Sequence, residues 1–283
     1  MANKQHASLH WLSNSESKVN EVLGRNILPV HANAGLVYDR YLPVWDSSVE
    51  NSPHAKNGLA ALKQLVKDYN KPSDRERRRI IDSLQQRQLQ YCNNLVWRSH
   101  DYWECELKST SRLVMGMGAD HPLENGFSWD DLYGVPYLPA SALKGLIRAT
   151  AKLFEVSWAE EVLGKDHGPE GDAAQTSLIT VFEVFPTSWP VLAVDIVNSH
   201  HPKYYKCSSD DKDEGIKLPV ETESPKPAFF LTVEAGATWR MRIMARKRLP
   251  VKLNEVGELA CEGLQCLGIG GKTAVGYGRM AAL

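Results

Sequence analysis

The sequence predicts an α+β fold of the ferredoxin-like class, with elements in the order strand, helix, strands, helix, strand. Three observations support this prediction. Apolar residues recur at helical spacing up to about residue 100, alternate with polar residues from Trp103, and later form two more helical patterns between β-rich segments. We expect an N-terminal helical region, residues 1–100, packed on a core domain, residues 101–283, with a loop insertion around residues 199–227.

The N-terminal region is predicted to contain two helices. The first carries Leu59, Leu62, Val66 and Tyr69 and ends at Asn70. The second follows Pro72, where Ser73 and Glu76 have the spacing of a capping box. Its start is rich in arginine, a pattern that fits either a solvated helix face or a binding surface.

The core domain begins with a predicted strand, in which Trp103, Cys105 and Leu107 alternate with polar residues until near Gly116. A turn-rich stretch then leads to a helix from near Ser141, whose expected core face is Leu143, Leu146, Ile147, Thr150 and Phe154. Further strands are expected at 178–185, 191–197, 229–233 and 239–245, and a loop at 208–226. A helix from Leu253 to Gly268, a glycine-rich segment and a short strand complete the chain.

The charges are segregated along the chain. The 283 residues carry 33 Lys+Arg and 34 Asp+Glu, which excludes a protein coated in positive charge. Residues 239–252 nevertheless contain six basic residues and no acid, and Arg240, Arg242 and Arg246 would share one face of a strand. Residues 155–172 hold six acids and one lysine. The arginine face therefore predicts either a polyanionic partner or intramolecular pairing with acidic segments.

The glycine-rich segment, residues 268–279, predicts a phosphate-contacting loop, because glycine lets backbone amides approach a phosphate closely. Gly271-Lys272-Thr273 matches the end of a P-loop, but Cys266 occupies the position of the first glycine. The segment also follows a helix, whereas a P-loop follows a strand. A nucleotide-binding P-loop is therefore excluded.

The cysteines and the apolar segments bear on the compartment. Five cysteines without a CxxC pair favour reduced thiols in a cytoplasmic protein. We find no signal-peptide core and no apolar run of membrane-spanning length, and no standard zinc spacing. We expect no membrane association, no metal and no cofactor.

Residues 134–148 (GVPYLPASALKGLIR) and the glycine-rich segment together resemble the RAMP superfamily of CRISPR-associated proteins. Residues 33–41 and 195–205 resemble, within it, the subfamily that supplies the sixth subunit of Cmr-type (type III-B) complexes. The resemblance implies an RNA-recognition-motif-like core and a non-catalytic subunit, near the filament end away from the 5′ tag. Its implied partners are crRNA, target RNA, the repeated backbone RAMP subunit and the neighbouring end RAMP subunit.

We expect three groups of RNA-binding residues. On the first core helix these are Ser141, Lys144 and Arg148, although Ala140 and Ala142 replace the glycine and serine usual in the family. In the loop they are Gly268, Gly270, Gly271, Lys272, Thr273, Gly276 and Arg279. Elsewhere they are His200, His201, Arg240 and Arg242.

Two other functions remain open. Some RAMP relatives are metal-independent crRNA-processing ribonucleases, and His200 or His201 could serve as the general base of such an enzyme. A protein scaffold, with its basic face against acidic neighbours, is the other alternative.

Overall fold

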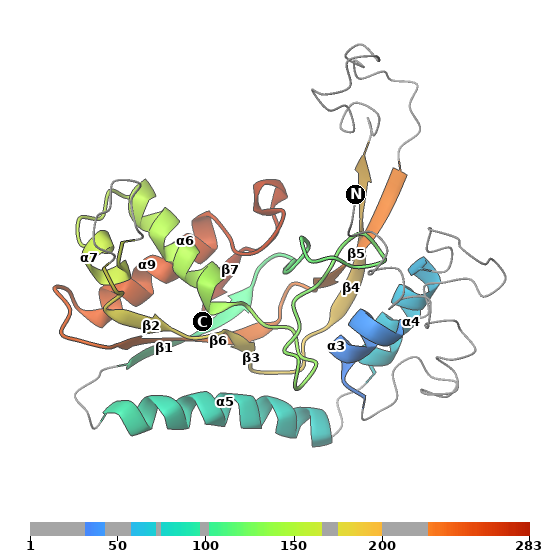
Figure 1. The fold of residues 1–283 in the computed structure, drawn as a ribbon, viewed down its shortest axis with the longest axis horizontal. Helices are drawn as coiled ribbons and strands as arrows, with labels where there is room; N and C mark the ends of the chain where they lie inside the picture. The colour runs from blue at the N-terminus through green and yellow to red at the C-terminus, as the bar shows by residue number, and fades with distance from the viewer. Residues whose placement is uncertain (1–31, 43–57, 72–74, 97–101, 166–174, 200–225) are drawn as a thin grey trace, which may run out of the picture.

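The computed structural model describes residues 32–42, 58–71, 75–96, 102–165, 175–199 and 226–283. Figure 1 shows a central sheet with helices on both of its faces and a two-stranded ribbon that extends away from it. The described part of the chain therefore combines helices with antiparallel strands, as predicted for an α+β fold.

Before the sheet, the chain forms a short helix α3 (Ala34–Leu36) with a π-helical turn η1 (Val37–Tyr41), then α4 (Gly58–Tyr69) and α5 (Arg75–Val96). Both predicted N-terminal helices are thus confirmed, while Ser73 lies outside the described residues. One arginine at the start of α5, Arg77, has a structural role within the protein. Its Nη1 donates to the carbonyls of Tyr69 and Lys71, both at 2.8 Å, and so satisfies the end of α4.

The main sheet contains β1 (Tyr102–Ser109), β2 (Ile179–Val181), β3 (Phe185–Pro186), β6 (Thr238–Ala245) and β7 (Met280–Ala282). Its order is β2-β6-β1-β7, with β3 also paired to β6, and every pair is antiparallel. With α6 (Ala140–Leu153) after β1 and α9 (Leu253–Cys266) after β6, this order confirms the ferredoxin-like class. The predicted strand 178–185 is two short pieces, and β1 ends at Ser109, before the predicted Gly116.

The two faces of the sheet are both covered. Trp239, Met241 and Ile243 of β6 are fully buried in the core that α6 and α9 complete. Helix α5 runs across the opposite face (Figure 1), where the amide of Gln88 donates to the carbonyl of Glu183 at 2.8 Å. RNA-recognition motifs stack bases on that second face of their sheet. In this chain α5 closes it, so RNA binding would need another surface.

The strands β4 (Leu192–Ser199) and β5 (Lys226–Val233) form a separate two-stranded sheet. A backbone bridge between Leu113 and Val233 joins this hairpin to the segment after β1. Residues 200–225, most of the predicted insertion, lie outside the described residues. The sequence patterns located these two strands but did not indicate that they leave the main sheet. The boundary drawn between residues 1–100 and 101–283 stays a prediction.

Two features follow α6. A short helix α7 (Ala159–Leu163) lies in the acidic stretch, where no helix was predicted. The prediction that Phe154 faces the core is wrong, since 47% of this residue is exposed. Phe154 is the C-cap residue, and the next residue, Glu155, has a left-handed backbone with φ of 52°. The amide of Val156 donates to the carbonyl of Ala151 at 2.9 Å, which completes a Schellman motif.

Glu155→Gly should stabilise the protein. A Schellman motif usually has glycine at this left-handed position, and a side chain there costs roughly 1 kcal/mol. We therefore expect the free energy of unfolding in urea to rise by about 1 kcal/mol. Glu124→Gly, at another left-handed residue with φ of 72°, should act in the same direction, whereas an unchanged or lower stability for both variants would contradict the prediction.

Candidate nucleic-acid interface

The glycine loop, residues 268–279, connects α9 to β7 and has a backbone that only glycine adopts freely. Gly268, Gly270, Gly276 and Gly278 have φ angles between 76° and 96°. At Gly270 an added Cβ would lie 2.2 Å from the carbonyl oxygen of Val114. The glycines are therefore required both by backbone conformation and by close approach to the neighbouring segment.

Backbone hydrogen bonds fix the loop to the segment that follows β1. The amide of Gly271 donates to Val114 O at 2.7 Å, and that of Gly278 donates to Arg112 O at 2.8 Å. Across the base of the loop, Ile269 N donates to Gly278 O at 2.9 Å. The tip is free of such packing, since Val275 is 69% exposed and an added Cβ on Gly276 would meet no atom within 4 Å. The loop is thus a rigid base that presents an accessible tip.

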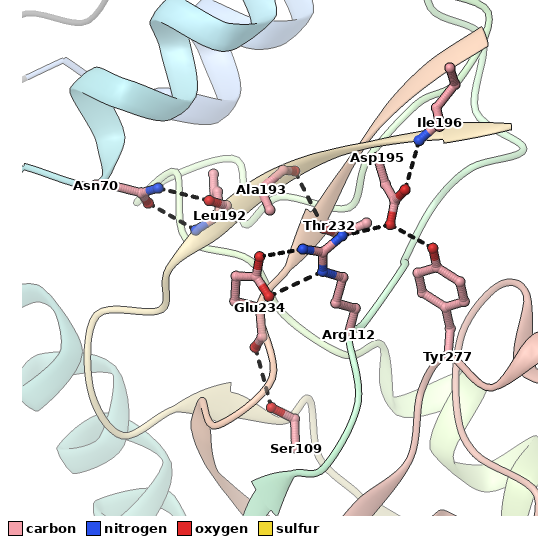
Figure 2. Close-up of polar contacts among 10 residues, drawn as sticks. All are labelled: Asn70, Ser109, Arg112, Leu192, Ala193, Asp195, Ile196, Thr232, Glu234 and Tyr277. Atoms are coloured by element: carbon pink, nitrogen blue, oxygen red, sulfur yellow. Dashed lines mark hydrogen bonds and ion pairs between the residues drawn. The ribbon is translucent and has the colours of Figure 1, made fainter. Parts of the chain in front are cut away.

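A polar cluster ties the same loop to the β4–β5 hairpin (Figure 2). The Tyr277 hydroxyl donates to Asp195 Oδ2 at 2.6 Å, and Arg112 Nη1 donates to the same oxygen at 2.8 Å. Arg112 also forms a two-bond pair with Glu234, at 2.7 and 3.1 Å. Burial alone would raise the pKa of Asp195, but the hydrogen bonds from Tyr277, its neighbour Ile196 and Arg112 hold it below the usual value. Asp195 is therefore ionised at neutral pH and joins loop to hairpin.

Lys272 has the most unusual conformation in the loop. It is a left-handed residue, with φ of 59°, although it is not glycine. Its ammonium lies 5.2 Å from the centre of the Phe230 ring, and among the described residues no carboxylate pairs with it. Thr273 follows as the first residue of the 3₁₀ turn η2 (Thr273–Val275). The loop therefore holds one cation next to its exposed tip without neutralising it.

The start of α6 lies at the same end of the sheet as the glycine loop (Figure 1). Ser141 is exposed in the first turn, and no side chain caps the helix at Pro139. An added Cβ on Gly145 would meet no atom within 4 Å, so this helical glycine leaves an open surface one turn further along. Exposed amides at a helix start, next to Lys144, are suited to a phosphate. Ser141 and Lys144 thus lie on the predicted helix, and their contacts with RNA stay a prediction.

Arg148 does not extend this surface. Its Nη2 donates to Gly164 O at 3.0 Å, at the end of α7, and its side chain lines a cavity of about 760 Å³ between the two helices. The Nη1 of Arg279 likewise donates to the carbonyl of Cys266, at the end of α9. Both arginines therefore satisfy helix ends, where cations are favourable.

The predicted arginine face of β6 is largely satisfied within the protein. Arg242 is 1% exposed, and its Nε donates to Glu104 Oε2 at 3.0 Å. Arg240 pairs with Glu106 at 3.1 Å. Both arginines thus pair with acidic residues of the protein itself, as one of the two predicted alternatives required. Their partners are on β1 and not in the acidic stretch 155–172. Arg242 lies beneath α5 and is not accessible to RNA in this fold.

His200 and His201 lie outside the described residues, so the ribonuclease alternative stays a prediction. Within the described ranges, no three histidine, cysteine or acidic residues are grouped as metal ligands would be. No helix in the described part of the chain is long and apolar enough to cross a membrane.

Arg112, Glu234 and Tyr277 position the loop, and none of them was predicted from the sequence. Asp195 lies 83 residues from Arg112 and 82 from Tyr277. Separations of this size have no periodicity, so only the fold brings these residues together. The one available signal was Tyr277 itself, an aromatic residue between two glycines.

Comparisons with known proteins agree with this architecture. The chain is 26% identical over 232 residues to "CRISPR system Cmr subunit Cmr6" of Pyrococcus furiosus, a match covering 62% of this chain and 66%, just under two thirds, of that protein. It is 24% identical over 258 residues to "CRISPR system CMR subunit Cmr6" of Saccharolobus solfataricus, covering 81% of each. A chain in the cryo-EM structure of the type III-B Cmr-beta bound to cognate target RNA has the same fold, with a TM-score of 0.52 and 18% identity over 85% of this chain and 77% of that one.

The RAMP superfamily model matches residues 106–281. This range begins within β1 and ends within β7, so it includes β2, β3, β6, both helices of the ferredoxin-like fold and the glycine loop. The chain belongs to the RAMP superfamily.

Proposed function

We propose that this protein is a non-catalytic, RNA-binding subunit of a type III-B CRISPR (Cmr) ribonucleoprotein complex. It contacts the backbone of crRNA or target RNA near the filament end away from the 5′ tag. Its protein partners are the repeated backbone RAMP subunit and the neighbouring end RAMP subunit. The names of the two Cmr6 relatives and the fold shared with a chain of an RNA-bound Cmr complex support this role.

The proposal rests on the left-handed backbone of Lys272 and on its ammonium, which no carboxylate neutralises among the described residues. Strained backbone conformations persist where function requires a particular residue, and a glycine at this position would remove the strain. The loop already uses glycine at four other left-handed positions, so a lysine here supplies charge at a cost in stability. Its ammonium has no carboxylate partner among the described residues. A phosphate is the ligand that such a cation next to an accessible loop tip would bind.

The proposed RNA surface combines this loop with the start of α6, at one end of the sheet. Ser141 and Lys144 would meet one phosphate, and the ammonium of Lys272 would meet another. Contacts of this kind read the backbone and not the bases, as a subunit serving many guides requires. We leave Arg148, Arg240, Arg242 and Arg279 out of this surface because their guanidinium groups satisfy carbonyls and carboxylates of the protein.

Lys272→Gly tests this function. We expect the dissociation constant for a labelled single-stranded RNA of mixed sequence to rise about tenfold, which corresponds to roughly 1.4 kcal/mol. The logarithmic salt slope should fall by about 0.7, as expected for one lost phosphate contact. Stability should stay unchanged or rise by up to about 1 kcal/mol, because glycine adopts this φ freely. Fluorescence anisotropy at several salt concentrations and urea unfolding provide the measurements.

Lys67→Ala is the matched control, because it removes one exposed cation from α4, away from the loop. It should leave both the dissociation constant and the salt slope near the wild-type values. Equal binding by Lys272→Gly and Lys67→Ala, in the free chain and in the reconstituted complex, would refute the proposed RNA surface.

A further inference from the structure

An apolar groove lies between the end of α6 and the outer face of α9. It has a volume of about 360 Å³ and is lined by Phe154, Val156, Trp158 and Leu259, together with three glutamates of α9. Val156, Trp158 and Leu259 pack on the core and form its floor. Phe154 is 47% exposed, and the adjacent Leu153 is 57% exposed. This groove therefore presents large apolar side chains to solvent.

The backbone is held in a costly conformation to form the groove. The left-handed Glu155 turns the chain sharply after α6, so that Phe154, Val156 and Trp158 line one hollow. A glycine would form the same Schellman turn with less strain. Strain retained at a surface hollow is a mark of functional positions, and it points to a role for this turn beyond ending a helix.

The glutamates give the groove a strongly negative rim. Glu255, Glu258 and Glu262 follow one another at helical spacing along α9. Their hydrogen-bond donors are neutral: Lys252 N, the Asn254 amide and the Cys266 thiol, respectively. In the described part of the chain, none of the three is paired with a cation. The rim therefore keeps its negative charge available to a partner.

We propose that this groove is the docking site for a segment of a neighbouring protein subunit, with apolar side chains flanked by lysine or arginine. The apolar side chains fill the groove between Phe154 and Leu259, and the basic residues pair with the three glutamates. RNA is excluded, because phosphates would face carboxylates at close range. The inference rests on the proposed function only in that the neighbour is taken to be another subunit of the same complex.

The position of the groove agrees with such a partner. It includes the end of α6, whereas the proposed RNA surface includes the start of α6, at the other end of that helix. In Figure 1 the end of α6 lies beside α7, at the left of the sheet, and the glycine loop lies further to the right, above the same face. One protein neighbour can therefore occupy the groove while RNA contacts the loop.

Photo-crosslinking identifies the occupant. The photoreactive residue p-benzoylphenylalanine replaces Phe154 in the full chain, which is assembled with the other subunits of the complex and irradiated. We expect a crosslink to a subunit peptide that carries lysine or arginine next to apolar residues. The same substitution at Leu132, which is 70% exposed outside the groove, should not crosslink to that peptide. A crosslink to RNA or to an acidic peptide, or none in the assembled complex, would overturn the proposal.

Charge reversal provides an independent test. Glu258→Lys with Glu262→Lys should lower incorporation into the complex by about tenfold in competition with wild-type chain. Glu255 is left unchanged because its carboxylate accepts a hydrogen bond from Lys252 N and caps α9. Asp120→Lys with Glu183→Lys reverses two exposed acids elsewhere and should incorporate like the wild type. Equal incorporation by both double variants would contradict the docking site.

RNA affinity of the free chain separates this inference from the proposed function. Both double variants should bind RNA at least as tightly as the wild type, because they add positive charge. If the groove variants assemble normally while Lys272→Gly loses RNA affinity, the docking site is wrong and the RNA-binding function stands. If instead the groove variants fail to assemble while Lys272→Gly keeps its RNA affinity, the docking site stands and the proposed RNA surface is wrong.

Discussion

Arg242→Ala is expected to lower the free energy of unfolding by about 3 kcal/mol, because the deleted side chain is buried and makes three hydrogen bonds. Arg242 Nε donates to Glu104, and its Nη1 donates to the side-chain oxygens of Gln85 and Gln88, all at 3.0 Å. Truncation leaves a cavity beneath α5 and removes the donor for two amide oxygens. Urea unfolding followed by circular dichroism measures the loss.

Arg240→Ala is the matched control. Arg240 lies two residues away on the same face of β6 and pairs with Glu106, but its side chain is 32% exposed. Its loss should cost about 1 kcal/mol or less, as for exposed ion pairs. Equal losses for the two alanine variants would contradict this account. Arg242→Met, which keeps most of the volume without the charge, should leave RNA affinity unchanged if Arg242 has no RNA contact.

Gly278→Ala is expected to destabilise the protein by about 3 kcal/mol, because it combines an unfavourable backbone angle with a steric clash. Its φ is 80°, and an added Cβ would lie 2.1 Å from the carbonyl oxygen of Ile269. That oxygen belongs to the backbone and cannot move away without breaking the base of the loop. Urea unfolding reports the stability, and RNA affinity should fall with it because the loop loses its shape.

Two alanine variants separate the causes. Gly276→Ala, with φ of 96° and no atom within 4 Å of the added Cβ, carries the backbone cost alone, about 1 kcal/mol. Gly145→Ala in α6 meets no atom either and should stabilise the helix by about 0.5 to 1 kcal/mol. A Gly278→Ala loss no larger than that of Gly276→Ala would contradict the close approach.

The sequence predicted the elements whose apolar residues follow one period. Helices α4, α6 and α9 and strand β1 each bury one regular face, so spacing alone locates them. Helix α7 has only five residues, too few for a period to be recognised. Phe154 fitted the helical pattern of α6, but the Schellman turn begins at that residue and directs it outward. Local geometry overrides periodicity at such ends.

The candidate site was less predictable than the fold. Glycine composition located the loop, because a backbone that needs positive φ selects its residues directly. The burial of the β6 arginines could not be predicted from composition in this way. Alternation placed Arg240 and Arg242 on one face correctly, but which element covers that face depends on α5, more than 140 residues earlier in the chain. Burial of a charge is a tertiary property, and strand spacing does not encode it.

The two-stranded hairpin has a consequence for local unfolding. A two-stranded ribbon is marginally stable alone, so β4 and β5 depend on their anchors. Asn70 exchanges two hydrogen bonds with Leu192, at 2.7 and 2.9 Å, and Arg112 binds Asp195 three residues further along β4. Amide hydrogens near Leu192 should therefore exchange with solvent more slowly than those near Asn198. Tyr277 and Arg112 both donate to Asp195. Opening of the hairpin base therefore also breaks a hydrogen bond of the glycine loop, so the two local unfolding events are energetically coupled.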